Sequence, residues 1–564
     1  MRRDSDRKRS PGSTPPHRRG RGPSFLGSTA LLAAAVLAAG PVPLLSGSAA
    51  AAAATPAAAA NPTSGYWTGT WAASPQSGGD SFSQQTIRQI VRTSIGGTVA
   101  RLQLSNAFGS SALTVADVHV AEAGSGSSIV SGTDHTVTFG GSSTVTIPAG
   151  GTGISDTVGF AIPALTEIAI SFYLPDATGA STYHSLSMQT SYIAGGDVSG
   201  ASSLAGAQTQ NNWYFLSSLD VQNPNSQGSV VALGASITDG YASTQDANDR
   251  WTDVLASRLN AAGDTIGVLN EGISGNRLLA DGSGQSALNR FDRDVLGQPG
   301  VRWVVFSDDP INDLGSTSPQ PTSAQLIAGV QQLIAEAHQN GIKFICSTLT
   351  PYQGAGYWNS SGETAREAYD AFVRSSTSGC DGVIDQDTAT HNPSAPTEFL
   401  PAYDSGDHLH PSDAGYQAIG NAVSLSLFTQ PNVPVISLRA HADGDIVTAD
   451  DGGASPLIAN RTAIGFWEQF DEIDEGGGAI ALRAHANGLI VTAEDAGAQS
   501  LIANRTVVGS WETFQLVHNA DGSVSFKADA DGDYVTAEDA GAQPLIANRT
   551  AIGTWEEFDL IQDS

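Results

Sequence analysis

Positive charge is scarce in this sequence. The 564 residues include 26 lysines and arginines against 56 aspartates and glutamates, which gives a formal net charge of −30 at pH 7. A surface of this sign repels nucleic acids and anionic membranes, so we expect neither as a partner. Neutral polymers suit it better, although solubility in an open medium explains most of the acidity by itself.

Cysteine is almost absent as well. The two cysteines, Cys346 and Cys380, do not stand at a metal-binding spacing, and no His-Glu-x-x-His or similar set occurs. We therefore expect neither a metal nor a cofactor. Both cysteines lie at or near strands expected at 343–347 and 382–384. A disulfide and a pair of buried free thiols stay equally open.

Long apolar runs are missing after the N-terminal segment. No later run of apolar residues approaches the length of about 18 that a membrane-spanning helix needs. Residues 1–22 hold eight arginines or lysines, residues 25–39 are apolar, and small residues fill 46–54. This order is typical of a secretory signal peptide, here with a low-complexity lead-in up to residue 60. We expect an extracellular protein without stable membrane insertion once the signal is removed.

The segment 66–221 alternates apolar and polar residues with a period of two, as in residues 100–105. Turns rich in Gly, Ser and Pro separate these short stretches. The pattern predicts a β-sandwich or jelly roll. Trp67 and Trp71 either pack in its core, which we favour, or bind sugar from an exposed position.

Strand and helix patterns alternate between residues 229 and 428, after a polar linker at 222–228, and this predicts a parallel α/β sheet. The clearest helix is 323–340, in which the apolar residues share one face and Gly341 follows the end. Further helices are expected at 251–259, 364–375 and 412–428.

Three repeats of 44 residues fill the segment 435–564. The spacing is kept by Leu438, Leu482 and Phe526, and by Trp467, Trp511 and Trp555. Strand-rich repeats without helices favour a β-trefoil, and a three-bladed or solenoid array is the alternative. The Val-Thr-Ala, Leu-Ile-Ala-Asn-Arg and Trp-Glu-x-Phe patterns resemble the fascin-like trefoil, whereas the Gln-x-Trp signature of ricin-type lectins is missing.

Four short blocks stand in the α/β segment. An apolar run ends at Ser236, the second block contains Gly275, the third contains Asn312, and the fourth contains Asp407 and His410. In this order they resemble the blocks of the SGNH (GDSL) esterase and acylhydrolase family. The resemblance implies a flavodoxin-like parallel sheet and ester hydrolysis. Residues 67–71 and 101–106 also resemble the β domain that precedes the hydrolase in a group of secreted bacterial GDSL proteins.

Ester hydrolysis needs a nucleophile and a base that takes its proton. Ser236 stands where a strand runs out into a turn and is the expected nucleophile. His410 is the expected base, and Asp407, three residues earlier, orients its imidazole. His408 and Asp404 form a competing pair. We favour Asp407 and His410 because they keep the family's Asp-x-x-His-Pro order.

The reaction also needs donors for a tetrahedral oxyanion. The resemblance implies that these are the amides of Ser236 and Gly275 and the side chain of Asn312. Gly suits a place where the backbone approaches a ligand closely. We expect Asp239 and Asp313 to brace turns.

Two residues depart from the family pattern. Ala235 replaces an Asp that is not a catalytic group, so little effect is expected. Pro310 replaces a Gly two residues before Asn312; it lacks an amide N–H and fixes φ. The acids at 308–309 add charge beside it. Together they put the geometry of the third block, and full activity, in question.

The sequence thus predicts a secreted esterase with three domains, at 66–221, 229–428 and 435–564. The expected reaction removes acetyl or other short acyl groups from a carbohydrate, and the trefoil is a candidate for polysaccharide binding. One alternative is a GDSL lipase or phospholipase. The other is a carbohydrate-binding protein whose hydrolase domain is inert.

Overall fold

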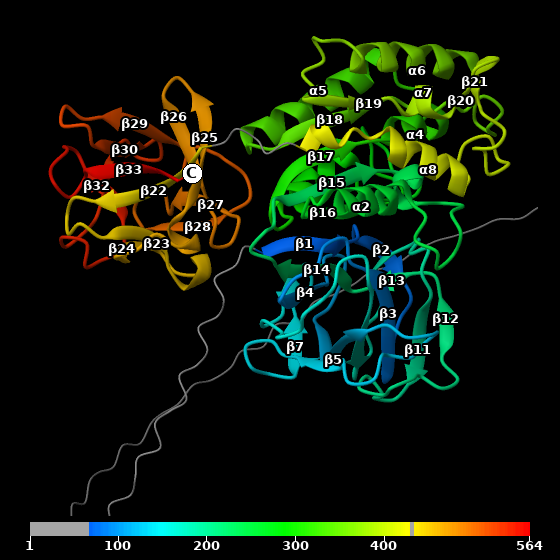
Figure 1. Ribbon diagram of the computed structural model, residues 1–564, viewed down its shortest axis with the longest axis horizontal. Coiled ribbons are helices and arrows are strands. Elements are labelled where there is room, and N and C mark those ends of the chain that lie inside the picture. Colours follow the sequence, from blue (N-terminus) through cyan, green and yellow to red (C-terminus); the bar gives the residue numbers. More distant parts are fainter. Residues whose placement is uncertain (1–66, 429–433, 564) are drawn as a thin grey trace, which may run out of the picture. The chain divides into compact units, whose positions relative to one another are not determined.

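The computed structural model describes residues 67–428 and 434–563, so the expected signal segment lies outside the described residues. Figure 1 shows a β-rich N-terminal region, an α/β region and a β-rich C-terminal region in chain order. Within the described ranges, no helix is long and apolar enough to cross a membrane.

The N-terminal region is formed by antiparallel strands. They pair in the orders β1-β14-β4-β8, β13-β10-β2 and β12-β11-β3-β9-β5-β6, with β7 beside β5. The strands are β1 (Trp67–Ala72), β2 (Gln76–Gly79), β3 (Gln85–Arg92), β4 (Val99–Ser105), β5 (Leu113–Glu122), β6 (His135–Val137), β7 (Thr144–Ile147), β8 (Thr152–Ile154), β9 (Glu167–Leu174), β10 (Ser181–His184), β11 (Ser191–Gly195), β12 (Gln208–Gln210), β13 (Trp213–Tyr214) and β14 (Leu216–Gln222).

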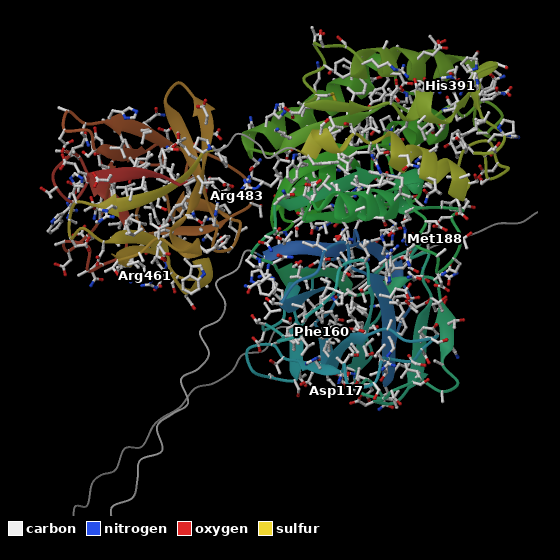
Figure 2. All side chains as sticks on the ribbon, viewed as in Figure 1. Asp117, Phe160, Met188, His391, Arg461 and Arg483 are labelled. Carbon is white, nitrogen blue, oxygen red and sulfur yellow. A yellow bond between two sulfur atoms is a disulfide. The ribbon has the colours of Figure 1, made fainter. Side chains whose placement is uncertain are left out.

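One apolar core is shared by the sheets of this region. It takes alternate residues from β4, β9 and β14, and Phe160, labelled in Figure 2, lies among them. Trp71 is 8% exposed and meets Trp213 edge-on with ring centroids 4.9 Å apart, so its predicted core role is confirmed. Trp67 is partly buried, and the Arg101 guanidinium lies 4.4 Å from the centre of its ring.

The α/β region contains a five-stranded parallel sheet in the order β16-β15-β17-β18-β19, as the strand–helix alternation predicts. Numbered along the chain, this is the order 2-1-3-4-5 of flavodoxin-like sheets. The strands are β15 (Gly228–Gly234), β16 (Ile266–Gly272), β17 (Val301–Phe306), β18 (Lys343–Ser347) and β19 (Gly382–Ile384), and a hairpin follows from β20 (His391–Asn392) and β21 (Ala395–Phe399).

Helices flank this sheet. They are α1 (Ser236–Asp239), α2 (Trp251–Ala262), α3 (Ala287–Phe291), η1 (Asp292–Leu296), α4 (Asp309–Ser316), α5 (Ser323–Gln339), α6 (Ser360–Val373), α7 (Gln386–Thr390), α8 (Asp413–Ala422) and η2 (Leu425–Phe428). The prediction for α5 is confirmed, with Thr322 capping its start. The single helix predicted at 412–428 is wrong, because Val423 takes an extended conformation and separates α8 from η2.

A disulfide joins Cys346 of β18 to Cys380, just before β19. Their Cα atoms are 5.8 Å apart, within the usual range for a disulfide. Because β18 and β19 are neighbours in the sheet, the two cysteines meet directly. The structure therefore selects the disulfide over the free thiols.

The C-terminal region holds three successive sets of four strands, one set per repeat. They are β22 (Val435–Ala440), β23 (Ile446–Ala449), β24 (Leu457–Arg461) and β25 (Phe470–Gly476); β26 (Ala479–Ala484), β27 (Ile490–Ala493), β28 (Leu501–Arg505) and β29 (Phe514–His518); and β30 (Val524–Ala528), β31 (Tyr534–Thr536), β32 (Ile546–Arg549) and β33 (Phe558–Asp563). Pairing of β22 with β33 closes the sheet into a barrel. Equivalent residues of the repeats, such as Phe470, Phe514 and Phe558, share one core.

Candidate active site

Ser236 begins the short helix α1, directly after β15. Asp308, which follows β17, holds this turn in place. Its carboxylate accepts hydrogen bonds from the amides of Ala235 (3.0 Å), Ile237 (2.8 Å) and Thr238 (3.2 Å), and from the Thr238 hydroxyl (2.7 Å). The two turns meet because β15 and β17 are parallel neighbours whose carboxyl ends lie at one edge.

His410 and Asp407 reach Ser236 from the loop before α8. His410 Nε2 lies 2.9 Å from Ser236 Oγ, and His410 Nδ1 lies 2.6 Å from Asp407 Oδ2. Burial by itself would raise the pKa of Asp407. The hydrogen bonds that its carboxylate accepts from the His410 ring and from the backbone amides of Leu409 and His410 outweigh burial and lower this pKa to about 2. Asp407 is therefore ionised at neutral pH and holds the proton on Nδ1, which leaves Nε2 to accept the serine proton.

The competing pair also forms, but away from the serine. His408 Nδ1 lies 2.6 Å from Asp404 Oδ2, and the His408 side chain is 56% exposed. Ser236 and His410, by contrast, are only 6% and 9% exposed. The preference for His410 over His408 thus agrees with the geometry.

The other two predicted residues, Gly275 and Asn312, lie in neighbouring loops linked through Asn276. Gly275 has a φ of 79°, a conformation that favours Gly, and a Cβ at this position would lie 2.7 Å from Ser283 Oγ. The Asn312 amide donates one hydrogen to the carbonyl of Asn276 at 2.9 Å, which leaves its second hydrogen for a ligand. The structure joins Ser236, His410 and Asp407 by direct contacts. Gly275 lies between Asn276, which contacts Asn312, and Ser274, which contacts Asp239 at the end of α1.

Tyr357 was not singled out from the sequence. Its hydroxyl donates to Asn312 Oδ1 at 3.2 Å, which fixes the amide with its nitrogen toward the Asn276 carbonyl. Its ring packs on Gly315, where an added Cβ would lie 2.1 Å away. The only local signal for Tyr357 is an aromatic pair, Tyr357-Trp358, in a loop after β18.

Pro310 does not distort the third block. It stands in the first turn of α4, where an amide N–H has no partner within the helix and a fixed φ suits the backbone. Asn312, two residues on, keeps its contact with Asn276. The expected disturbance at this position is therefore not seen.

Asp309 is fully buried, and its carboxylate oxygens have no hydrogen-bond partner in the described structure. Burial, against the opposing charge of Arg290 at 3.7 Å, raises the pKa of Asp309 to about 7. The two acids at 308–309 thus differ: the charge of Asp308 is compensated by donors, and Asp309 is largely neutral below about pH 7.

We expect Asp309→Asn to raise the free energy of unfolding at pH 8 but not at pH 4. The folded protein keeps the Asp309 proton to about pH 7, whereas the unfolded chain loses it near pH 4. This acid therefore lowers stability as the pH rises between those values, by about 1.4 kcal/mol per pKa unit. Urea unfolding at both pH values measures the gain, and an equal gain at both would contradict the assignment.

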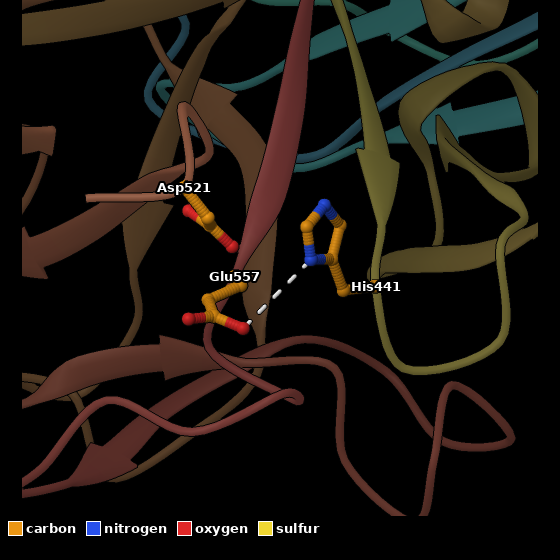
Figure 3. A group of neighbouring side chains, drawn as sticks. All are labelled: His441, Asp521 and Glu557. Carbon is orange, nitrogen blue, oxygen red and sulfur yellow. Dashed lines mark ion pairs between the residues drawn. The ribbon is translucent and has the colours of Figure 1, made fainter. Parts of the chain in front are cut away.

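A separate group of side chains lies in the C-terminal barrel. His441, Asp521 and Glu557 place ligand atoms within 4.8 Å of one another, and in Figure 3 they point toward a common centre. Within residues 67–428 and 434–563, it is the one group of His, Cys, Asp or Glu side chains close enough to hold a metal ion. Asp559 already contacts His441 Nε2 at 2.8 Å, and Asp521 is exposed, so the contacts of this group are those of surface ion pairs. The sequence did not indicate it, because its members are far apart in the chain.

Comparison with known proteins finds a family match for one part of the chain. Residues 232–418 match the model of the GDSL-like Lipase/Acylhydrolase family. This range contains all five residues of the site. No curated protein matches the chain.

Solved structures resemble separate parts of the chain. An α/β hydrolase enzyme, LAE5, from the metagenome of Lake Arreo, Spain, is 22% identical over 36% of this chain and 95% of its own, with a TM-score of 0.28. A GDSL-like lipase from Bacteroides thetaiotaomicron is 17% identical over 36% and 88%, with a TM-score of 0.27. The designed threefold-symmetric protein ThreeFoil is 20% identical over 22% and 97%, with a TM-score of 0.21.

Proposed function

Since residues 232–418 form a GDSL-like lipase/acylhydrolase domain, this protein is an ester hydrolase, and we propose that it is a secreted serine esterase that removes acetyl or other short acyl groups from carbohydrate. The observation that carries the proposal is the contact of Ser236 Oγ with His410 Nε2 at 2.9 Å, backed by Asp407 on the other ring nitrogen. The roles of these residues are part of the proposal.

Acylation begins when Ser236 Oγ attacks the ester carbonyl carbon and His410 Nε2 takes the hydroxyl proton. The negative charge moves to the carbonyl oxygen, which accepts hydrogen bonds from the Ser236 and Gly275 amides and from Asn312 Nδ2. Collapse of this intermediate breaks the bond to the alcohol oxygen, which takes the proton from His410. The alcohol leaves, and Ser236 carries the acyl group.

Deacylation repeats these steps with water. His410 Nε2 removes a proton from the water molecule, whose oxygen attacks the acyl carbon. A second tetrahedral intermediate forms in the same oxyanion hole and releases the carboxylic acid, and Ser236 recovers its proton from His410. Ionised Asp407 stabilises the imidazolium in both halves of the reaction.

Two features beside the site support a sugar ester with a short acyl group. Tyr241 is 44% exposed, and its ring lies 4.3 Å from the His410 ring. An exposed aromatic face at the mouth of a site suits a sugar ring. Tyr357 packs on Gly315 and contacts Asn312, and we propose that its ring limits the room for a long acyl chain.

The test of this substrate class is a panel of p-nitrophenyl esters of two to sixteen carbons, run beside acetylated xylan. The proposal expects the highest kcat/KM at two to four carbons and release of acetate from the polymer. A maximum at long chains would favour a lipase or phospholipase instead. No hydrolysis of any ester would favour an inert binding protein.

We also propose that the N-terminal region is a β-sandwich and that the C-terminal region is a fascin-like β-trefoil that targets the enzyme to polysaccharide. Three four-stranded repeats closed by β22 and β33 support the trefoil. Each repeat carries a tryptophan at the equivalent position, and that of the third, Trp555, is 36% exposed. Such a ring can stack on a sugar.

We expect a chain that ends at Gln430 to keep its kcat on p-nitrophenyl acetate within about twofold and to lose binding to insoluble polysaccharide. The C-terminal core contains only residues between Ile436 and Phe558, and the catalytic residues all precede it. Pull-down with xylan, cellulose, chitin and arabinogalactan measures the binding. If the shortened chain binds and deacylates these polymers as well as the whole chain does, the targeting role is wrong.

A further inference from the structure

The hydrolase site is not built from the α/β region alone, because residues of the N-terminal region form hydrogen bonds with residues of the α/β region. Strand β1 lies beside β16, and the Gly69 amide donates to the carbonyl of Pro299 at 3.1 Å. A second contact is made near Met188, labelled in Figure 2, whose carbonyl accepts from the Asp246 amide at 3.0 Å. The second contact lies in the loop that follows α1, the helix that begins at Ser236.

Asp239, the last residue of α1, connects the N-terminal region to the turn that carries Ser236. The residue is 3% exposed, and its two carboxylate oxygens face different parts of the molecule. Oδ2 accepts from the amide of Ser274 at 2.8 Å and from its hydroxyl at 2.7 Å. Oδ1 lies 3.0 Å from Nε2 of His184, which belongs to β10 of the N-terminal region.

His184 is held in one orientation. It is 3% exposed; its Nδ1 lies 3.0 Å from the Ser74 carbonyl, and its Nε2 also lies 3.1 Å from the Leu186 carbonyl. Every one of these partners is an oxygen that only accepts, so both ring nitrogens carry hydrogen. Burial opposes this charged form, but Asp239 outweighs burial and raises the pKa of His184.

We propose that His184 is a positioning residue for ester hydrolysis, which fixes the oxyanion-hole loop through Asp239 and Ser274. Ser274 immediately precedes Gly275, whose amide is one of the three donors. The amide and hydroxyl of Ser274 both donate to Asp239 Oδ2, while His184 contacts the other carboxylate oxygen, Oδ1. The inference rests on the proposed function, since it assigns a role to the same oxyanion hole.

A second bridge from the N-terminal region reaches the same turns. Ser74 Oγ donates to Glu271 Oε2 at 2.5 Å and accepts from Arg290 at 2.9 Å. The same guanidinium donates to the carbonyls of Glu271 (2.6 Å) and Gly234 (3.0 Å), at the ends of β16 and β15. The strands that lead to Gly275 and Ser236 are thus tied to the N-terminal region through buried polar groups.

Losing His184 leaves the Asp239 carboxylate buried with one partner fewer, and the Ser274–Gly275 segment becomes free to shift. An oxyanion donor acts only when it lies about 2.7–3.1 Å from the developing charge. A misplacement of about 1 Å can cost about a hundredfold in rate. The effect belongs to the transition state, so kcat falls and KM changes little.

The test compares His184→Gln with His119→Gln in the full-length protein. His119 is a matched control because it is also buried in the N-terminal region, 8% exposed, and pairs with an acid, Asp134, at 2.9 Å. With concentrations normalised by the folded fraction, we expect His184→Gln to lower kcat on p-nitrophenyl acetate about 10- to 100-fold, with KM within about threefold. We expect His119→Gln to stay within about twofold.

Ser274→Ala and the double variant His184→Gln/Ser274→Ala show whether the two residues act together. If they do, the losses in kcat are not multiplicative. Hydrogen exchange supplies a readout that needs no activity: the Ser274 amide should exchange faster in His184→Gln than in His119→Gln. Unchanged exchange together with a kcat within twofold, or equal losses in both histidine variants, would overturn the role of His184.

Failure of the proposed function is distinguishable from this result. If the proposed function is wrong, either the unmodified protein does not hydrolyse the ester, or Ser236→Ala hydrolyses it equally fast. The exchange rate of Ser274 in His184→Gln still reports on the loop in that case. If only the His184 role is wrong, the unmodified and variant proteins react equally fast.

Discussion

Ser236→Ala is expected to lower kcat on p-nitrophenyl acetate by on the order of a million-fold, as loss of the nucleophile does in serine hydrolases. The hydroxyl that contacts His410 Nε2 at 2.9 Å is the group that forms the acyl-enzyme. Without it the oxyanion donors have no covalent intermediate to stabilise, and only weak residual catalysis by bound water remains.

Ser243→Ala is the matched control for this variant. Ser243 is another buried serine, seven residues further on, whose hydroxyl donates to the Gly240 carbonyl at 2.8 Å and lies outside the proposed machinery. We expect its kcat to stay within a few-fold of the unmodified protein. Steady-state kinetics on both variants test whether Ser236 is the nucleophile. A kcat in Ser236→Ala comparable to that of the unmodified protein would mean that another group attacks the ester.

Asn312→Ala is expected to lower kcat by about a hundred- to a thousand-fold, with a smaller change in KM. The Asn312 amide donates one hydrogen to the Asn276 carbonyl and has one left for the oxyanion, so truncation removes a transition-state donor.

Tyr357→Phe removes only the hydroxyl that donates to Asn312 Oδ1, and we expect kcat to fall about tenfold.

Pro310→Gly is the control for Asn312→Ala. Because Pro310 fits the first turn of α4, restoring the family's Gly should change kcat by less than about threefold. A gain of tenfold or more would show that Pro310 does handicap the site. An unchanged kcat in Asn312→Ala would mean that the Asn312 side chain does not donate to the oxyanion.

The five candidate site residues were predicted from the resemblance of four short sequence blocks, taken in order, to the GDSL family. Ser236 closely follows the end of β15, Gly275 and Asn312 stand in the second and third blocks, and Asp407 and His410 are three residues apart in the fourth. The parallel sheet brings the blocks together, because its strands all end at one edge. The 44-residue period likewise predicted the three strand sets of the C-terminal region.

The supporting residues could not be found in this way. His184 lies 55 residues from Asp239, its partner, and nothing in its own surroundings marks it. The sequence shows Asp308 only as added charge beside the third block, because only the fold reveals that three amides and a hydroxyl donate to its carboxylate. The break between α8 and η2 was missed because Val423 fits a helical pattern and departs from it only in its backbone angles.

The most direct test of the central claim is the site of reaction with diethyl p-nitrophenyl phosphate, read by peptide mass mapping. This reagent is attacked by an activated serine and leaves a stable phosphoryl group on it. The account predicts one label per chain, on Ser236, and none in Ser236→Ala. A label on another residue, or no label on a folded and unmodified protein, would contradict it.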